Sequence, residues 1–177
     1  MKNLNRLAVI VLAILLAAAF ACKKEVEAPS DIAVFDCGST DKVVNADRVT
    51  VDKTVTSDGN GSLKVATETP LTVQLFEVPY PKAQDSELTF KAKIKTSEFG
   101  GDAYLQMIVH FPNGGSLNAQ NYQNAIRGTT DWTELSTSVV IQPGQKPDSV
   151  NLNLVVNGVG TVWVDDIHLV KAPRVAQ

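Results

Sequence analysis

The sequence predicts an all-β fold, a two-sheet antiparallel jelly-roll β-sandwich preceded by a signal peptide and a short tether. The first observation is that residues 32–171 contain no sustained helical period, while short runs rich in Val, Ile, Thr and Leu recur about every 8–15 residues. The second is that turn-forming clusters separate these runs, among them SDGNGS, EFGGD, FPNGGS, QPGQKPD and NGVG. The third is size, because 177 residues, 44% of them hydrophobic, suffice for one domain with a buried core.

The N-terminal segment has the pattern of a secretion signal. Lys2 and Arg6 supply positive charge ahead of the apolar run LAVIVLAILLAAAF (7–20), whose length of about 14 residues is short for a bilayer span of roughly 20. The run leads into AFAC, which resembles a bacterial lipobox ending at Cys22. This resemblance implies that residues 1–21 are a lipoprotein signal peptide and that a lipid on Cys22 anchors the protein to a membrane. An ordinary cleaved signal peptide and a retained anchor are the alternatives.

The other boundaries follow from composition. Residues 22–31, with the charged sequence KKEVE followed by Pro29 and Ser30, are predicted to be a tether, residues 32–171 the β-sandwich domain, and residues 172–177 a tail. The expected location is the bacterial cell envelope, lipid-anchored at the outer membrane or the cell surface. An acylated Cys22 leaves Cys37 without a disulfide partner, so we expect Cys37 to be a small buried hydrophobe.

Alternation along the strands predicts which side chains face the core. A one-residue slip would bury the polar set of each run, so the apolar set must point inward. Run by run, the inward sets are Leu71, Val73 and Leu75; Leu88, Phe90, Ala92 and Ile94; Leu105, Met107, Val109 and Phe111; Leu135, Val139 and Ile141; and Val150, Leu152, Leu154 and Val156.

The outward sets are of two kinds. Runs 88–95 and 135–141 carry Lys, Thr or Ser outward, as on an ordinary solvated surface, whereas runs 71–76, 104–111 and 150–156 carry amides and aromatic side chains, Phe76 among them. Because a jelly roll sends successive strands to opposite sheets, we expect the amide-bearing strands to be neighbours in one sheet. Amide groups beside an aromatic ring suit sugar hydroxyls and the C–H face of a sugar. The predicted carbohydrate-binding residues are Gln74, Tyr104, Gln106, His110, Tyr122, Arg127, Asn151 and Asn153.

The last strand raises a separate question, because GTVWVDDIHL carries Asp165 and Asp166 although Asp is depleted from strands. This strand, together with TTDWTELSTSVVI, VNLNLVV, IAVFDCGS and DGNGSLKV, resembles the carbohydrate-binding modules with a galactose-binding-like jelly roll, over about 140 residues from 32 to 171. The resemblance implies a structural Ca²⁺ held by oxygen ligands. The implied ligands are the carboxylates of Asp36 and Asp165 and the carbonyls of Gly61 and Ser62. The alternative is a pair of solvated carboxylates on an edge strand, or a bulge between them.

The sequence favours a binding protein over an enzyme. It contains no Gly-x-Ser-x-Gly, His-Glu-x-x-His or phosphate-binding glycine motif, and neither His110 nor His168 lies in a nucleophile motif. A net charge of −3 without an arginine-rich run makes nucleic acid an unexpected partner. The expected function is non-catalytic binding of a poly- or oligosaccharide, and the alternative is a structural or protein-interaction module of the cell envelope without a sugar ligand.

Overall fold

The computed structural model describes residues 27–174, and all the strand pairings within them are antiparallel. No helix in this part of the chain has the length and apolar character needed to cross a membrane. The predicted signal peptide at 1–21, and Cys22 with it, lies outside the described residues. The elements are β1 (Ser30–Phe35), η1 (Ala46–Arg48), β2 (Thr50–Asp52), β3 (Ser62–Thr67), β4 (Leu71–Pro79), β5 (Ser86–His110), β6 (Ser116–Gln120), η2 (Tyr122–Asn124), β7 (Thr130–Ile141) and β8 (Ser149–Pro173).

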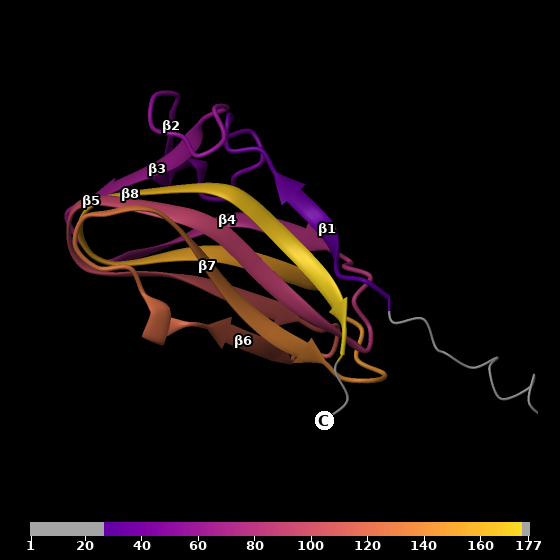
Figure 1. Ribbon diagram of the computed structural model, residues 1–177. Coiled ribbons are helices and arrows are strands. Elements are labelled where there is room, and N and C mark those ends of the chain that lie inside the picture. The colour runs from indigo at the N-terminus through magenta and orange to yellow at the C-terminus, as the bar shows by residue number, and fades with distance from the viewer. Residues whose placement is uncertain (1–26, 175–177) are drawn as a thin grey trace, which may run out of the picture.

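Two long strands, β5 and β8, join the two layers of the sandwich. Each has 25 residues, and they pair with one another along nearly their whole length. Residues 86–97 of β5 and 160–173 of β8 form one layer together with β7, β1, β3 and β2. We call it the lysine layer. Residues 100–110 of β5 and 149–158 of β8 form the second layer together with β4 and β6. We call it the amide layer. The described strands therefore make one continuous hydrogen-bonded sheet that folds over on itself (Figure 1).

Three glycines allow β5 and β8 to bend where they pass from one layer to the other. Gly101 and Gly158 are directly paired across β5 and β8, and a Cβ at either position would collide with the backbone of the other strand. Gly160 has φ +130°, a backbone conformation that side chains disfavour. The clusters EFGGD and NGVG, which were predicted to be turns between separate strands, are therefore bends within single strands.

The core lies between the two layers and contains most of the predicted inward side chains. The inward residues of β5 (Leu88, Phe90, Ala92, Ile94, Leu105, Met107 and Val109) and of β8 (Val150, Leu152, Leu154 and Val156) are all at most 1% exposed. Period-two alternation therefore predicts the packing of the two long strands correctly.

The prediction that Phe76 points outward is wrong. A register shift between the pairs Gln74–Asn153 and Phe76–Leu152 inserts an extra residue in β4, so Leu75 and Phe76 both enter the core. The Phe76 ring is 2% exposed and stacks on Phe35 with ring centroids 4.0 Å apart. The next residue, Glu77, then takes the exposed position opposite Asn151.

Candidate functional site

The amide layer brings the predicted polar residues side by side on its outer face. Gln106 on β5 pairs with Asn153 on β8, and Asn153 pairs in turn with Gln74 on β4. One step along β8 on the same face lies Asn151, with His110 on the neighbouring strand. We call Gln74, Gln106, His110, Asn151 and Asn153 the amide face.

Hydrogen bonds across the strands hold these side chains in place. The Asn153 Nδ2 group donates to Gln106 Oε1 at 3.1 Å, and Gln106 Nε2 lies 3.5 Å from Gln120 Oε1 on β6. Asn151 Nδ2 lies 3.3 Å from Nε2 of His110. Because the amide N–H groups of Asn151 and Asn153 point along the sheet to His110 and Gln106, their own carbonyl oxygens take no part in these hydrogen bonds.

Two buried acceptors on this face have no hydrogen-bond partner. The side-chain oxygens Asn151 Oδ1 and Asn153 Oδ1 are buried and unpaired within the protein, and Asn153 is only 6% exposed. An unpaired buried polar group costs about 1–3 kcal/mol of stability, so such groups are rare in folded proteins. A ligand that donates hydrogen bonds would satisfy both, once the two side chains turn enough to expose their oxygens.

An aromatic cluster continues the face toward the bend. Tyr104 lies two residues before Gln106, on the same outer side of β5. Its ring meets the ring of Tyr122 edge-on, with centroids 5.5 Å apart. Tyr122 belongs to η2, which is held beside β5 by two backbone hydrogen bonds between Ala103 and Ile126. The structure therefore places Tyr122 next to the amide face, although Tyr122 does not belong to a strand of the sheet.

A carboxylate that the sequence analysis missed anchors this cluster. Asp102 Oδ2 accepts a hydrogen bond from the Tyr122 hydroxyl at 2.9 Å, and Asp102 Oδ1 is ion-paired with Arg127, whose guanidinium lies 5.7 Å from the Tyr122 ring centroid. The cluster EFGGD was interpreted as a turn, which hid the role of its last residue. Asp102, Tyr122 and Arg127 together orient the exposed aromatic ring.

The acidic pair on β8 is explained by a β-bulge. Between the pairs Lys91–His168 and Lys93–Asp165, β8 has one residue more than β5, and Asp166 has φ +53°. The bulge sends the two carboxylates to different places. Asp165 is 2% exposed, while the Asp166 side chain is about a third exposed.

Protein groups surround both carboxylates. Asp165 Oδ2 accepts from the Ser57 amide at 2.7 Å, and Asp165 Oδ1 accepts from the Asp166 amide at 2.8 Å. Asp166 lies 2.9 Å from Nε2 of His168 and 3.0 Å from Nζ of Lys93. These two partners, His168 first, lower the pKa of the Asp166 carboxyl below its ordinary value.

The residues expected to bind calcium do not form an open cation site. Asp36 Oδ1 accepts from the Gly38 amide at 2.8 Å, and both oxygens of Asp165 already accept from backbone amides. The ammonium of Lys53, which the sequence analysis also missed, already lies among the nearby carbonyl oxygens. Within residues 27–174 no group of three or more His, Cys, Asp or Glu side chains is arranged to hold a metal. These residues fit Ca²⁺ poorly, and the calcium ion stays a prediction.

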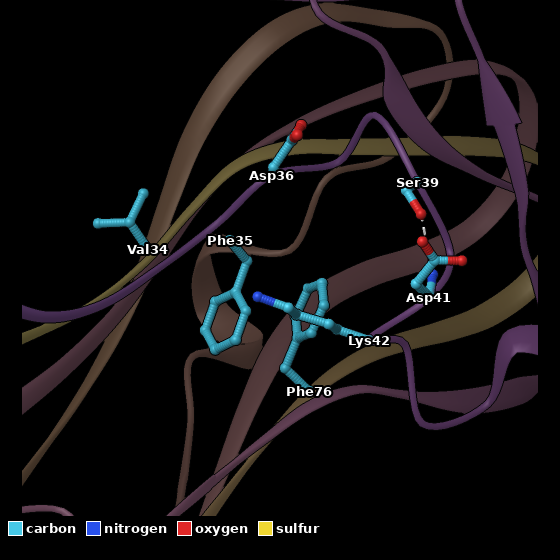
Figure 2. Close-up of a pocket in the computed structure, with 7 residues that line it drawn as sticks. All are labelled: Val34, Phe35, Asp36, Ser39, Asp41, Lys42 and Phe76. Atoms are coloured by element: carbon cyan, nitrogen blue, oxygen red, sulfur yellow. Dashed lines mark hydrogen bonds between the residues drawn. The ribbon is translucent and has the colours of Figure 1, made fainter.

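A small hollow lies beside β1, away from the amide face. It is lined by Val34, Phe35, Asp36, Ser39, Asp41, Lys42 and Phe76, none of which was predicted to bind sugar. In Figure 2 the Lys42 side chain crosses in front of the Phe76 ring, while the Asp36 carboxylate points away from both aromatic rings. Asp36 lines the edge of this hollow, and its carboxylate accepts the Gly38 amide of the following loop.

Comparison with known proteins identifies the fold. No family model and no curated protein matches the chain. The CBM22-1 xylan-binding domain of Paenibacillus barcinonensis Xyn10C is 14% identical with a TM-score of 0.59, covering 84% of this chain and 99% of its own. A family 16 carbohydrate-binding module is 14% identical with a TM-score of 0.53, covering 69% of this chain and 84% of its own. The predicted jelly-roll fold of carbohydrate-binding modules is therefore confirmed.

The same fold also occurs in a protein that is not described as a carbohydrate-binding module. A cyclase from Fischerella sp. TAU is 10% identical with a TM-score of 0.57, covering 84% of this chain and all of its own. At these identities the likeness concerns the fold alone. The function must therefore be argued from the side chains of the site.

Proposed function

We propose that this protein is a non-catalytic carbohydrate-binding module whose amide face binds a poly- or oligosaccharide. The observation that carries the proposal is the pair of buried, unpaired acceptors Asn151 Oδ1 and Asn153 Oδ1 on that face. Sugar hydroxyl groups donate hydrogen bonds, so a bound sugar would satisfy both oxygens when the two side chains turn toward it. The likeness of the fold to carbohydrate-binding modules supports this reading.

The aromatic cluster would supply the second part of recognition. A pyranose ring presents apolar C–H groups on one side, and these pack on an aromatic face while hydroxyls at the ring edge reach polar groups. Tyr104 is half-buried and lies one step along the strand from Gln106, so one sugar can contact both. Tyr122, which is 48% exposed, would extend the contact to a neighbouring sugar unit.

Binding is expected to be modest because the face is open to water. Each protein–sugar hydrogen bond replaces one made to water, which leaves a small net gain. We expect a Kd on the order of 10 µM to 1 mM, equivalent to roughly −4 to −7 kcal/mol. Longer chains should bind better than single sugars, since the face extends from Tyr122 to His110 along β5 and its neighbours.

Calorimetry against a panel of soluble polysaccharides tests this function. Tyr104→Ala should weaken binding by about 1–2 kcal/mol without unfolding the domain, because it removes one aromatic contact. Glu134→Ala is the matched control, since Glu134 is exposed on β7 in the lysine layer. Absence of heat across the panel, or equal losses in the two variants, would overturn the assignment and favour a protein-interaction module of the cell envelope.

The proposal includes no catalytic step. The carboxylate beside the aromatic cluster, Asp102, is engaged by Tyr122 and Arg127, so it is not a free acid or base. Glycoside hydrolysis usually needs two carboxylates placed on either side of the scissile bond. Incubation with the polysaccharide that binds should therefore release no new reducing ends, and release that is lost in Asp102→Asn would contradict the proposal.

We also propose that a lipid on Cys22 anchors the module to the bacterial cell envelope, at the outer membrane or cell surface. The AFAC sequence after the apolar run supports this, and the short segment from Cys22 to the start of β1 at Ser30 would hold the module close to the membrane. Labelling with a radioactive fatty acid should mark the wild-type chain and leave Cys22→Ala unlabelled. Equal labelling of the two would refute the anchor.

A further inference from the structure

Two loops, the one after β1 and the one between β2 and β3, meet around the side chain of Lys53. The ammonium group Nζ donates to the backbone carbonyl of Gly38, after β1, at 2.7 Å and to that of Asn60, before β3, at 2.9 Å. Lys53 itself follows β2. The contact with Asn60 lies within the β2–β3 hairpin, while the contact with Gly38, 15 residues away in sequence, links this hairpin to the loop after β1.

Glycines make room for this ammonium. A Cβ built on Gly38 would lie 3.1 Å from Lys53 Nζ, and one built on Gly61 would lie 3.2 Å from Lys53 Cδ. Gly61 also has φ +129°, which other residues rarely adopt. Both loops therefore approach the lysine side chain closely with their backbone, although Lys53 remains exposed to solvent.

The groups around the Lys53 ammonium are oxygen atoms of the kind that bind cations. Two carbonyl oxygens point at the ammonium, and the Asp36 carboxylate lies beside Gly38, whose amide it accepts. Carbonyl and carboxylate oxygens are also the groups that Ca²⁺ prefers. Asp165, the other expected carboxylate ligand, instead accepts the amide groups of Ser57 and Asp166, one on each oxygen.

We infer that the Lys53 ammonium is the cation of this site, and that the protein is held together there without calcium. A divalent ion placed against the Gly38 and Asn60 carbonyls would have to displace Lys53 and would meet strong repulsion from its charge. The ammonium supplies two charge-assisted hydrogen bonds, and it cannot be removed by a chelator.

Thermal unfolding of the full chain tests the inference. The melting temperature of the wild type should be the same in EDTA and in millimolar CaCl₂, and mass spectrometry of the native protein should find no retained calcium. Lys53→Met keeps an unbranched apolar side chain but leaves two carbonyls without their donor. Charge-assisted hydrogen bonds are worth more than neutral ones, but water can replace part of this exposed donor, so we expect a fall of about 1–4 °C.

The control is Lys82→Met, which removes an exposed lysine in the turn between β4 and β5 and should leave the melting temperature unchanged. If Lys53→Met does not fold, Lys53→Arg, which keeps the charge, should fold with a smaller loss. Selective acetylation gives a second readout, since Lys53 should react more slowly than Lys82. A calcium-dependent rise in melting temperature of the wild type, or equal behaviour of Lys53→Met and Lys82→Met, would overturn the inference.

Discussion

Replacing Asn153 by leucine should stabilise the protein while weakening its binding of sugar. Asn153 lies in the middle of the amide face, is 6% exposed, and has a side-chain oxygen without any partner. A residue kept for the fold would be expected to have all its polar atoms paired. Asn153 would instead be kept for its ligand, at a cost to the stability of the free protein.

The magnitude follows from the contacts of this one side chain. Removing the unpaired oxygen returns about 1–3 kcal/mol, while losing the 3.1 Å hydrogen bond to Gln106 costs about 0.5–1.5 kcal/mol. Gln106 is half-exposed, so water can replace the lost donor. Leucine has a similar size and suits a strand better than asparagine. We therefore expect a net gain of about 0–2 kcal/mol, or a rise in melting temperature of up to about 5 °C.

Asn45 provides a control, because its replacement by leucine should change the stability in the opposite direction. Asn45 Oδ1 accepts the backbone N–H of Gln74 at 2.7 Å at the edge of β4. Asn45→Leu leaves that amide without its acceptor and should destabilise the protein by about 1–3 kcal/mol. The comparison thus separates an asparagine that serves the fold from one that serves a ligand.

Urea unfolding and calorimetry on the two variants provide the assay. With the polysaccharide found in the panel, Asn153→Leu should bind at least several-fold more weakly than wild type, because about 1.4 kcal/mol corresponds to a tenfold change in Kd. The reasoning is refuted if Asn153→Leu loses as much stability as Asn45→Leu. It is also refuted if the variant binds sugar as tightly as wild type.

Three further outcomes test other parts of the structure. Phe76→Ala should reduce the free energy of unfolding by about 3–5 kcal/mol, since the ring is buried against Phe35, whereas an outward ring would cost little. Because the pKa of Asp166 is lowered in the folded state, its stabilising contribution is present above the ordinary carboxyl pKa near 4 and is lost as the pH falls through the folded value. The difference in melting temperature between wild type and Asp166→Asn should therefore shrink below about pH 4, and a constant difference down to pH 2 would contradict the ion pair with Lys93. Burial, aided by nearby carboxylates, raises the pKa of the Cys37 thiol, so this thiol should resist alkylation at pH 8 in the native protein and react once unfolded.

The amino-acid sequence alone determined the fold class and the side of the sheet on which most side chains lie. Alternation is a local property, because successive side chains of a strand point to opposite faces whatever the strand pairs with. For this reason the buried positions of β5 and β8 were predicted correctly. The grouping of Gln74, Gln106 and Asn153 on one face followed from the same alternation together with the jelly-roll connectivity.

Only the tertiary structure decided features that depend on how strands meet. The extra residue in β4, which buries Phe76 and exposes Glu77, and the extra residue in β8 at Asp166 both arise from pairing with a partner strand, and neither has a local signal. The same holds for Lys53, whose contacts join two loops, and for Asp102, which meets Tyr122 across 20 residues of sequence. A bulge or a long-range hydrogen bond is selected by the free energy of the whole packed arrangement, and a pattern read along one strand carries no information about it.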